Sequence, residues 1–322
     1  MKKIGFSIAC FNEEENIEEL YKRINQAMEN LDYEYTMLFI DNDSQDRSQE
    51  ILRNLAENDH RVKVIMNNKN FGPDKSGAHG FYNALGDGDA LIAMACDLQD
   101  PPEMIPQFLE KWEQGEKLVL GRKVASEESK GMYFIRGLYY KIMSFFLPKD
   151  EEIDQITGFG LYDREIVENM EKVYDPNPCF RYLLGEMGYK PAYIDFVQPQ
   201  RLHGVSSYNF FSYLDTAIVT LVTNSKKPVR LLVYVSTVLC ALNALGAIAF
   251  LVAGFFSYSL WLGLGFFVLA FLISCTLFAI SFIGEYVVEI LEREKGRPLV
   301  YEKCRLNFEE SIDEKSETIK KS

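Results

Sequence analysis

Three short polar runs carry the side chains best suited to charged or hydrogen-bonding ligands. They are Phe11-Asn12-Glu13, Asp41-Asn42-Asp43-Ser44 and Asp97-Leu98-Gln99-Asp100, and each directly follows an apolar stretch. Carboxylate and amide oxygens accept hydrogen bonds strongly, and they also coordinate hard divalent cations. Taken one at a time, residues such as Asn12 and Ser44 are equally ordinary turn or helix N-cap residues. The chemistry therefore depends on whether the fold brings the runs together.

Strand-like and helix-like apolar patterns alternate along residues 4–120. Strands are predicted over Ile4–Cys10, Tyr35–Ile40, Val62–Met66, Ala90–Ala95 and Leu118–Leu120, and helices over Glu14–Glu29, Gln49–Glu57, Lys75–Leu85 and Glu103–Glu113. This alternation predicts an α/β domain with a mostly parallel sheet covered on both faces. In such sheets ligands bind beyond the carboxyl ends of the strands. All three polar runs fall there, so we expect them to meet at one edge.

The overall composition narrows the class of protein. The chain has 322 residues and a formal net charge of −13, which argues against nucleic acid as a partner because such binding relies on cationic patches. Its six cysteines are scattered without a CxxC pair, which predicts unpaired thiols in a reducing compartment. The start, Met1-Lys2-Lys3, leads into a strand pattern, and no signal peptide is predicted.

The second half contains a long uncharged stretch. From Leu231 to Gly284 there is no Asp, Glu, Lys or Arg, which is enough for two bilayer crossings, predicted at about 231–256 and 260–284. Basic residues flank both ends, so both termini are expected on the cytoplasmic side. They are Lys226, Lys227 and Arg230 before the stretch, and Arg293, Lys295 and Arg297 after it. A helical hairpin buried inside a soluble protein is the alternative.

These patterns divide the chain into four parts. A cytoplasmic domain is predicted over residues 1–207, a juxtamembrane amphipathic segment over 208–229, the two transmembrane helices within 230–288, and a cytoplasmic tail over 289–322. The end of the tail is charged and poor in apolar residues, which predicts disorder. The oligomeric state stays open, with residues 296–298 as a candidate contact with a neighbouring subunit.

Several motifs in order resemble one enzyme family over residues 4–303. They are Phe11-Asn12-Glu13-Glu14-Glu15-Asn16, Ile40-Asp41-Asn42-Asp43-Ser44-Gln45-Asp46, Asn70-Phe71-Gly72, Asp97-Leu98-Gln99-Asp100-Pro101-Pro102, Gly204-Val205-Ser206-Ser207-Tyr208 and Gly296-Arg297-Pro298. The chain is similar to the family 2 glycosyltransferases of GT-A (Rossmann-like) fold. Within that family it resembles the membrane-anchored branch that includes dolichyl-phosphate mannose synthases and bacterial polyprenyl-phosphate glycosyltransferases.

The resemblance implies a nucleotide-sugar site at the strand ends. Asp41 would accept a hydrogen bond from the base, Glu13 would contact the nucleotide, and the main chain near Ala9 and Phe11 would line its site. Glu13 is also suited to the first turn of a helix, where the helix dipole favours an acid.

The same resemblance implies a divalent cation, Mg²⁺ or Mn²⁺, on Asp97 and Gln99, shared with the diphosphate of the donor. Relatives carry an Asp two residues before Asp97, where this chain has Ala95. One carboxylate ligand is therefore missing. The alternative role for Asp97 is to cap the helix that begins near Pro101.

Cations are expected to bind the acceptor phosphate and to assist its attack. By the resemblance these are Arg122, Arg201 and His203, with Ser206 nearby; as isolated residues they would more often be surface charges. Arginine presents a planar fork that fits phosphate oxygens. Some relatives carry a proposed catalytic Asp at the position of Gly158, and a Lys often stands at Ser207. A phosphate acceptor is already an anion and needs no general base, so the absence of that Asp favours a lipid phosphate.

The resulting expectation is a membrane-anchored, inverting glycosyltransferase. It would move a sugar, with a UDP-hexose favoured, onto a polyprenyl phosphate at the cytoplasmic face, with Asp97, Arg122 and Arg201 as its catalytic residues. One alternative is a catalytically degenerate membrane scaffold that binds a nucleotide-sugar, because Ala95 and Gly158 replace acids. Another is transfer to a hydroxyl group of a glycan or lipid.

Overall fold

The computed structural model describes residues 1–125, 156–173, 175–199 and 259–308, together with isolated positions between Lys227 and Leu245. By its internal contacts the chain divides into two compact units. The first comprises Met1–Tyr133, Asp150–Ser207 and Arg297–Ser322, and the second comprises Phe134–Lys149 and Tyr208–Gly296. The predicted juxtamembrane segment and most of the first predicted span lie outside the described residues.

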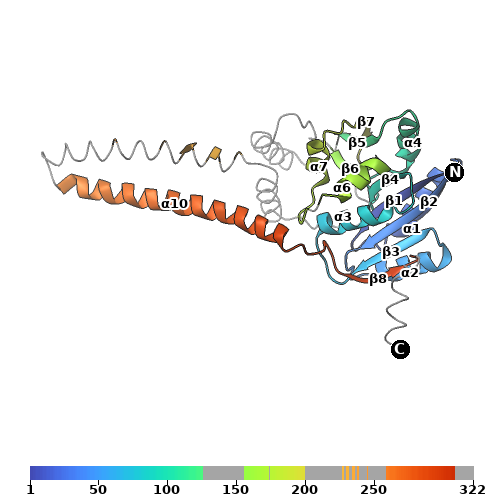
Figure 1. The fold of residues 1–322 in the computed structure, drawn as a ribbon. Coiled ribbons are helices and arrows are strands. Elements are labelled where there is room, and N and C mark those ends of the chain that lie inside the picture. Colours follow the sequence, from blue (N-terminus) through green and yellow to red (C-terminus); the bar gives the residue numbers. More distant parts are fainter. Residues whose placement is uncertain are drawn as a thin grey trace. The chain divides into compact units, whose positions relative to one another are not determined.

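The described strands of the first unit form one sheet in the order β7-β5-β6-β4-β1-β2-β3-β8 (Figure 1). Their bounds are β1 Lys2–Cys10, β2 Tyr33–Asp41, β3 Val62–Asn67, β4 Ala90–Ala95, β5 Leu118–Ala125, β6 Ile156–Asp163, β7 Ala192–Val197 and β8 Glu302–Leu306. β1 pairs in parallel with β2 and β4, β2 with β3, and β5 with β7. β6 and β8 run the opposite way. The predicted α/β, mostly parallel sheet is confirmed.

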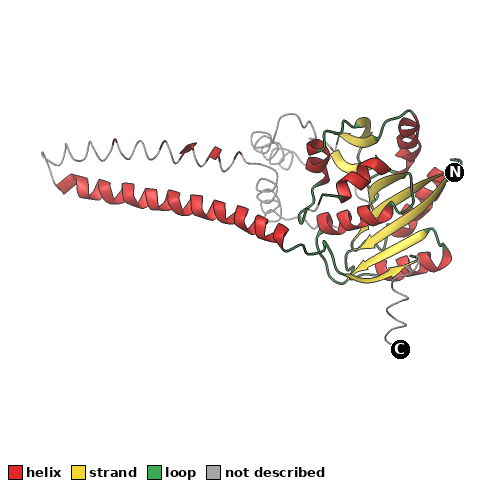
Figure 2. Cartoon of the chain, in the orientation of Figure 1, coloured by secondary structure: helices red, strands yellow, loops and turns green. Residues whose placement is uncertain are grey.

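Helices cover both faces of this sheet (Figure 2). α1 (Ile17–Met28), α2 (Ser48–Asn58) and α4 (Ile105–Glu113), preceded by the short helix η1 (Pro102–Met104), bury apolar side chains on one face. α3 (Pro73–Ala84), α6 (Arg164–Glu171) and α7 (Phe180–Glu186) cover the other. In α1 the buried residues Ile17, Leu20, Ile24 and Met28 follow the three-to-four-residue spacing that the sequence predicts. Burial on both faces explains why the central strands read as continuous apolar runs.

Two glycines let α3 approach the sheet closely. A Cβ atom on Gly5 of β1 would lie 2.3 Å from the carbonyl oxygen of Ala84, and one on Gly80 of α3 would lie 2.7 Å from the Cγ2 atom of Ile40. Gly72 precedes α3 with φ 87°, a left-handed conformation that disfavours other residues. α3 therefore begins at the carboxyl edge of β3 and lies tightly across β1 and β2.

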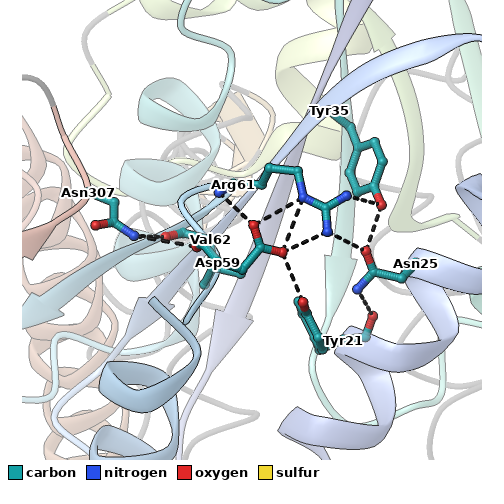
Figure 3. Close-up of polar contacts among 7 residues, drawn as sticks. All are labelled: Tyr21, Asn25, Tyr35, Asp59, Arg61, Val62 and Asn307. Atoms are coloured by element: carbon teal, nitrogen blue, oxygen red, sulfur yellow. Dashed lines mark hydrogen bonds and ion pairs between the residues drawn. The ribbon is translucent and has the colours of Figure 1, made fainter. Parts of the chain in front are cut away.

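A polar cluster connects α1, β2 and the α2–β3 turn (Figure 3). The guanidinium of Arg61 donates to both carboxylate oxygens of Asp59 and to the hydroxyl of Tyr35, while the hydroxyl of Tyr21 donates to Asp59 at 2.9 Å. Burial alone would raise the pKa of Asp59, but the hydrogen bonds from Arg61 and Tyr21 lower it below its usual value. The cluster lies at the end of the sheet opposite to the carboxyl ends of β1 and β2.

The second unit contains the helix α10 (Ser259–Glu294). The sequence predicts a helix over 260–284, so the helical state of this segment is confirmed and continues ten residues further, to Glu294. Within the residues whose side chains the structure describes, no helix has both the length and the apolarity needed to span a bilayer.

The segment after α10 returns to the first unit. β8 pairs antiparallel with β3, with Val64 opposite Leu306 and Met66 opposite Cys304. From the sequence, these residues are expected in a tail, and no strand is predicted there. The end of that tail, from residue 309, lies outside the described residues.

Candidate active site

Four loops follow neighbouring parallel strands at the carboxyl edge of the sheet. We call them the β1 loop (residues 11–16), the β2 loop (42–47), the β3 loop (68–72) and the β4 loop (96–101). The sheet order β4-β1-β2-β3 makes the strands before these loops adjacent. The expectation that the three polar runs share one edge is therefore met by the topology.

Three of these loops turn through left-handed backbone conformations. Asn12, Asp43 and Leu98 have φ values of 55°, 64° and 60°. Each follows its strand by two or three residues. For a residue other than glycine this conformation costs roughly 1–2 kcal/mol, less for Asn and Asp, whose side chains form local hydrogen bonds. Surrounding contacts must hold such turns, and strained turns concentrate at functional sites.

Hydrogen bonds between the β1 and β2 loops hold the first two turns. The Asn12 amide donates to the Ser44 Oγ at 2.9 Å, and the Gln45 amide donates to the Asn12 Oδ1 at 2.8 Å. One residue further, the Glu13 amide donates to the Ser48 Oγ at 2.9 Å. Each loop both donates to and accepts from the other, so neither loop can move away without breaking these hydrogen bonds. The donor side of the predicted site is therefore prebuilt.

Asp41 ends β2 and is fully buried. Its Oδ2 accepts hydrogen bonds from the Ser44 amide at 3.2 Å and the Gln49 side chain at 2.8 Å. Its Oδ1 is buried and has no hydrogen-bond partner in the described part of the chain. Burial raises the pKa of Asp41, and the hydrogen bonds from Ser44 and Gln49 offset only part of that shift. A buried acceptor without a donor is costly, so a ligand N–H group at Oδ1 would stabilise it.

Glu13 is partly buried, and its described contacts are with the start of α1 and with α2. Its carboxylate accepts a hydrogen bond from the Asn16 side chain, and its carbonyl accepts from the amides of Asn16 and Ile17 at the start of α1. The helix-start role that the sequence allows is thus present. Ala9 and Phe11 are partly exposed on either side of Cys10. The Ala9 carbonyl accepts a hydrogen bond from the Cys96 amide at 3.2 Å, which joins β1 to the β4 loop.

The β4 loop holds both predicted metal ligands. Asp97 is 8% exposed, and its Oδ1 accepts from the Gln99 amide at 3.1 Å. The Gln99 side-chain amide points to the carbonyl of Pro199, 3.5 Å away. Pro199 is two residues before Arg201, so the chain that leads to the predicted phosphate-binding residues passes beside the predicted metal ligand.

Asp100 holds the β4 loop in its conformation, although it is not among the site residues predicted from the sequence. Its carboxyl is buried and accepts a hydrogen bond from the Ala95 amide at 2.8 Å, which closes the turn around Leu98. Burial raises the pKa of Asp100 to about 7, the Ala95 amide opposes this shift and the charge of Asp97 adds to it. A single sequence shows only an acid before two prolines, because the burial of Asp100 depends on the turn itself.

Asp97 and Gln99 alone supply too few ligands for a divalent cation, so a bound substrate would have to supply the others. Among the described residues, no group of three or more His, Cys, Asp or Glu side chains could enclose a metal ion. Asp97 and Gln99 contribute two oxygen-bearing side chains on one turn. Mg²⁺ is commonly held by one or two carboxylates plus substrate phosphates, so this set suits an ion completed by a diphosphate.

An asparagine cluster, which the sequence analysis did not single out, joins the β2 and β3 loops. The Asn42 Oδ1 accepts from the side chain of Asn67 at 3.1 Å and from the amide of Phe71 at 3.0 Å. The Asn42 Nδ2 donates to the Asn70 Oδ1 at 2.9 Å. Asn42 is 5% exposed and directly follows Asp41. The sequence signals were two separate motifs, Asn70-Phe71-Gly72 and the polar run that contains Asn42, with no sign that they meet.

Arg122 lies on a different part of the sheet from the β1, β2 and β4 loops. Its guanidinium donates to both carboxylate oxygens of Asp195 on β7, at 2.7 and 3.0 Å, and lies 5.1 Å from the ring centre of Tyr193. These residues line an open cavity of about 510 Å³ between α4 and β7. The predicted partners Arg201, His203 and Ser206 lie outside the described residues.

The two positions at which relatives carry an Asp and this chain does not, Ala95 and Gly158, lie on the neighbouring strands β4 and β6. Ala93 of β4 pairs with Gly160 of β6. Ala95 comes two residues after Ala93, and Gly158 comes two residues before Gly160. Because the strands are antiparallel, both residues lie toward the carboxyl end of β4. Gly158 has φ 90°, a conformation that an aspartate rarely adopts. The backbone here is thus built for glycine.

Known proteins resemble this chain along most of its length. The sequence model of glycosyl transferase family 2 matches residues 6–170. An uncharacterized glycosyltransferase of Bacillus subtilis (strain 168), YkcC, is 31% identical over 307 residues, which cover 92% of this chain and 93% of that protein. The bactoprenol glucosyl transferase of Shigella phage SfV is 28% identical over 312 residues, which cover 92% of this chain and 96% of that protein.

A third relative is the undecaprenyl-phosphate 4-deoxy-4-formamido-L-arabinose transferase of Photorhabdus laumondii subsp. laumondii. It is 29% identical over 307 residues, which cover 92% of each chain. The α/β domain, its loops at the carboxyl edge and these matches agree with one another. The chain is a glycosyltransferase that belongs to glycosyl transferase family 2.

Proposed function

We propose that this glycosyltransferase moves a sugar from a nucleotide-sugar to a polyprenyl phosphate and inverts the anomeric configuration. The observation that carries the donor half is Asp41, whose buried Oδ1 lacks a donor among the described residues. A nucleobase N–H is a suitable donor for it. The acceptor half is supported by two relatives named for bactoprenol and undecaprenyl phosphate, each of which aligns with 92% of this chain.

A UDP-linked hexose is the favoured donor. A relative named as a glucosyl transferase supports a hexose. In this arrangement the base would bind at Asp41, and the ribose and diphosphate would extend across β1 toward Asp97. The paired β1 and β2 loops keep this path fixed before the donor arrives, so less ordering is needed on binding.

Charge stabilisation at the leaving group is the main chemical task of the β4 loop. Asp97 and Gln99 would hold Mg²⁺ or Mn²⁺, which would neutralise the charge that grows on the departing diphosphate. Asp100 keeps the loop closed through the Ala95 amide. In this proposal the carboxylate of Asp97 would face the donor diphosphate.

The acceptor phosphate would attack as an anion. Its oxygen needs no proton removed near neutral pH, so glycine at position 158 is compatible with catalysis. Arg122, Arg201 and His203 are the proposed cations for this phosphate, with Ser206 beside them. Arg122 would have to exchange its contact with Asp195 for the phosphate, or bind the phosphate with Asp195 still attached.

Membrane anchoring is the proposed way to reach such an acceptor. The uncharged stretch from Leu231 to Gly284 is long enough for two crossings, and basic residues flank it on both sides. Anchoring would hold the site near the headgroups at the cytoplasmic face. Cysteine-labelling reagents that cannot cross membranes should leave the first unit unlabelled from outside an intact cell; labelling from outside would contradict this topology.

The direct test is transfer of radiolabel into lipid. Purified full-length protein, undecaprenyl phosphate, Mg²⁺ or Mn²⁺ and a panel of UDP- and GDP-sugars should yield one labelled lipid that is labile to mild acid. Asp97→Asn should reduce this product to a trace, whereas Glu116→Gln, at an exposed position on the turn before β5, should leave it unchanged.

A nucleotide-binding scaffold is the second candidate, because Ala95 and Gly158 stand where relatives carry acids. Binding of a nucleotide without any labelled lipid, across all donors and both metals, would favour the scaffold. A labelled lipid from even one donor would exclude it.

A further inference from the structure

The C-terminal segment (residues 300–308) is anchored on the half of the sheet that carries the proposed donor site. Val300 is 3% exposed, and β8 pairs with β3 directly after it. At the far end, the Asn307 side chain donates to the carbonyl of Ala56 at 2.6 Å. It also donates to the carbonyl of Val62 at 2.8 Å, and Figure 3 shows this second bond. Both ends of the segment are therefore fixed to the first unit.

The same segment contacts the outer side of the β3 loop. The Asn68 amide donates to the Tyr301 carbonyl at 2.9 Å, and the rings of Tyr301 and Phe71 have centroids 6.2 Å apart. One residue further, the Glu302 carboxylate lies within hydrogen-bond distance of His79 on α3. The loop and the first turns of α3 are thus held from outside by residues after α10.

The inner side of the β3 loop is bound to Asn42. The Phe71 amide and the Asn70 side chain both contact the Asn42 side chain, and the Asn42 amide donates to the Cys10 carbonyl at 3.0 Å. Phe71 therefore touches Tyr301 through its ring and Asn42 through its backbone. Asn42 is bonded in sequence to Asp41, the proposed base contact.

We infer that Tyr301 is a positioning residue for the donor site, because its contact with Phe71 holds the β3 loop against Asn42 and thereby orients Asp41. This inference rests on the proposed function in one respect, namely that Asp41 binds the base of the donor. It assigns a role in donor binding to a residue far along the chain that does not touch the donor.

The test compares three variants of the full-length protein in detergent. Tyr301→Ala removes the ring, Tyr301→Phe keeps it, and Lys303→Ala changes an exposed residue two positions further along the chain, in β8. Binding of UDP and GDP is measured by calorimetry, and donor KM and kcat by lipid transfer. Loss of one aromatic contact should weaken nucleotide binding and raise the donor KM about two- to tenfold in Tyr301→Ala, with kcat unchanged. Tyr301→Phe and Lys303→Ala should match the wild type.

Hydrogen exchange of the β3 loop separates this inference from the proposed function. Tyr301→Ala should speed exchange at residues 68–72 while Lys303→Ala does not, whether or not a nucleotide binds. Wild-type exchange in that loop, or wild-type nucleotide affinity in a Tyr301→Ala protein that binds UDP or GDP, would overturn the inference. A wild-type protein that binds neither nucleotide would overturn the donor assignment instead, and the exchange result would still decide the role of Tyr301.

Discussion

The loops that follow β1, β2 and β3 at the carboxyl edge are joined to one another by hydrogen bonds, whereas Arg122 on β5 pairs with an exposed acid on the edge strand β7. In the first region, Asn12 and Asp43 adopt left-handed conformations and their loops exchange bonds. In the second, both Arg122 and Asp195 have side chains that are close to half exposed. If the first region binds the donor and the second binds the acceptor phosphate, as proposed, the donor site is preorganised, while Arg122 has a partner that the phosphate can replace.

The largest effect should come from Asp97. Asp97→Asn removes the negative charge of a proposed metal ligand but keeps its size, so kcat for transfer should fall about 100- to 1000-fold, as for the loss of one contact that stabilises transition-state charge. Nucleotide binding without metal should stay unchanged by calorimetry. Retained transfer with a folded protein would place the metal elsewhere.

Asp41→Asn tests the donor region without touching the metal ligands. The amide would keep the shape of the side chain, but one acceptor would become a donor facing the base. Leaving a buried N–H group unpaired should raise the donor KM about 10- to 100-fold. Asp43→Asn is the matched control, because Asn also tolerates the left-handed conformation. An equal effect in both variants would mean that the charge of the loop matters rather than Asp41 itself.

Replacing Arg122 should have a smaller effect, and it should change the KM for the acceptor rather than the KM for the donor. Arg122→Ala should raise the KM for polyprenyl phosphate about threefold to tenfold and leave the donor KM unchanged, because an exposed cation contributes modestly to anion binding. Asp195→Asn releases the guanidinium and should lower that KM. If Arg122→Ala leaves the acceptor KM at its wild-type value, Arg122 serves only the contact with β7.

The smallest effect concerns stability alone. Asp59 has a lowered pKa in the folded protein, so its contribution is present above the pKa of the unfolded chain, near 4, and is lost as the pH falls through the lower, folded value. Asp59→Asn should lower the melting temperature by about 2–4 °C at pH 7. The two proteins should converge toward pH 3. Donor and acceptor KM values should not change, because the cluster lies away from the site loops.

Local apolar spacing was sufficient to predict the central strands and helices. Differences occur where a partner far along the chain decides the outcome. The predicted helix at Glu14 begins only at Ile17, because the Glu14 amide donates to Asp46 of the β2 loop. The predicted strand Leu118–Leu120 continues to Ala125, since β7 pairs with it beyond Leu120.

In the candidate site, too, features that depend on contacts between distant segments could not be predicted from the sequence. The acids at strand ends were predictable, because parallel topology alone brings strand ends together. The burial of Asp100 and the asparagine cluster around Asn42 were not, because both depend on how turns fold back on neighbouring loops. β8 was missed for a related reason. Its residues alternate between exposed and partly buried positions and form a strand only where β3 supplies an edge.

The position of β8 also has a consequence for biosynthesis. The outer edge of β3 is complete only when residues 302–306 have left the ribosome, after the whole of α10. Until then the nascent chain exposes an unpaired strand edge, which is a template for aggregation. A chain that stops after α10 would keep every residue proposed here to touch substrate and yet retain that open edge. Premature termination near the C-terminus should therefore be detected as poor yield before it is detected as altered kinetics.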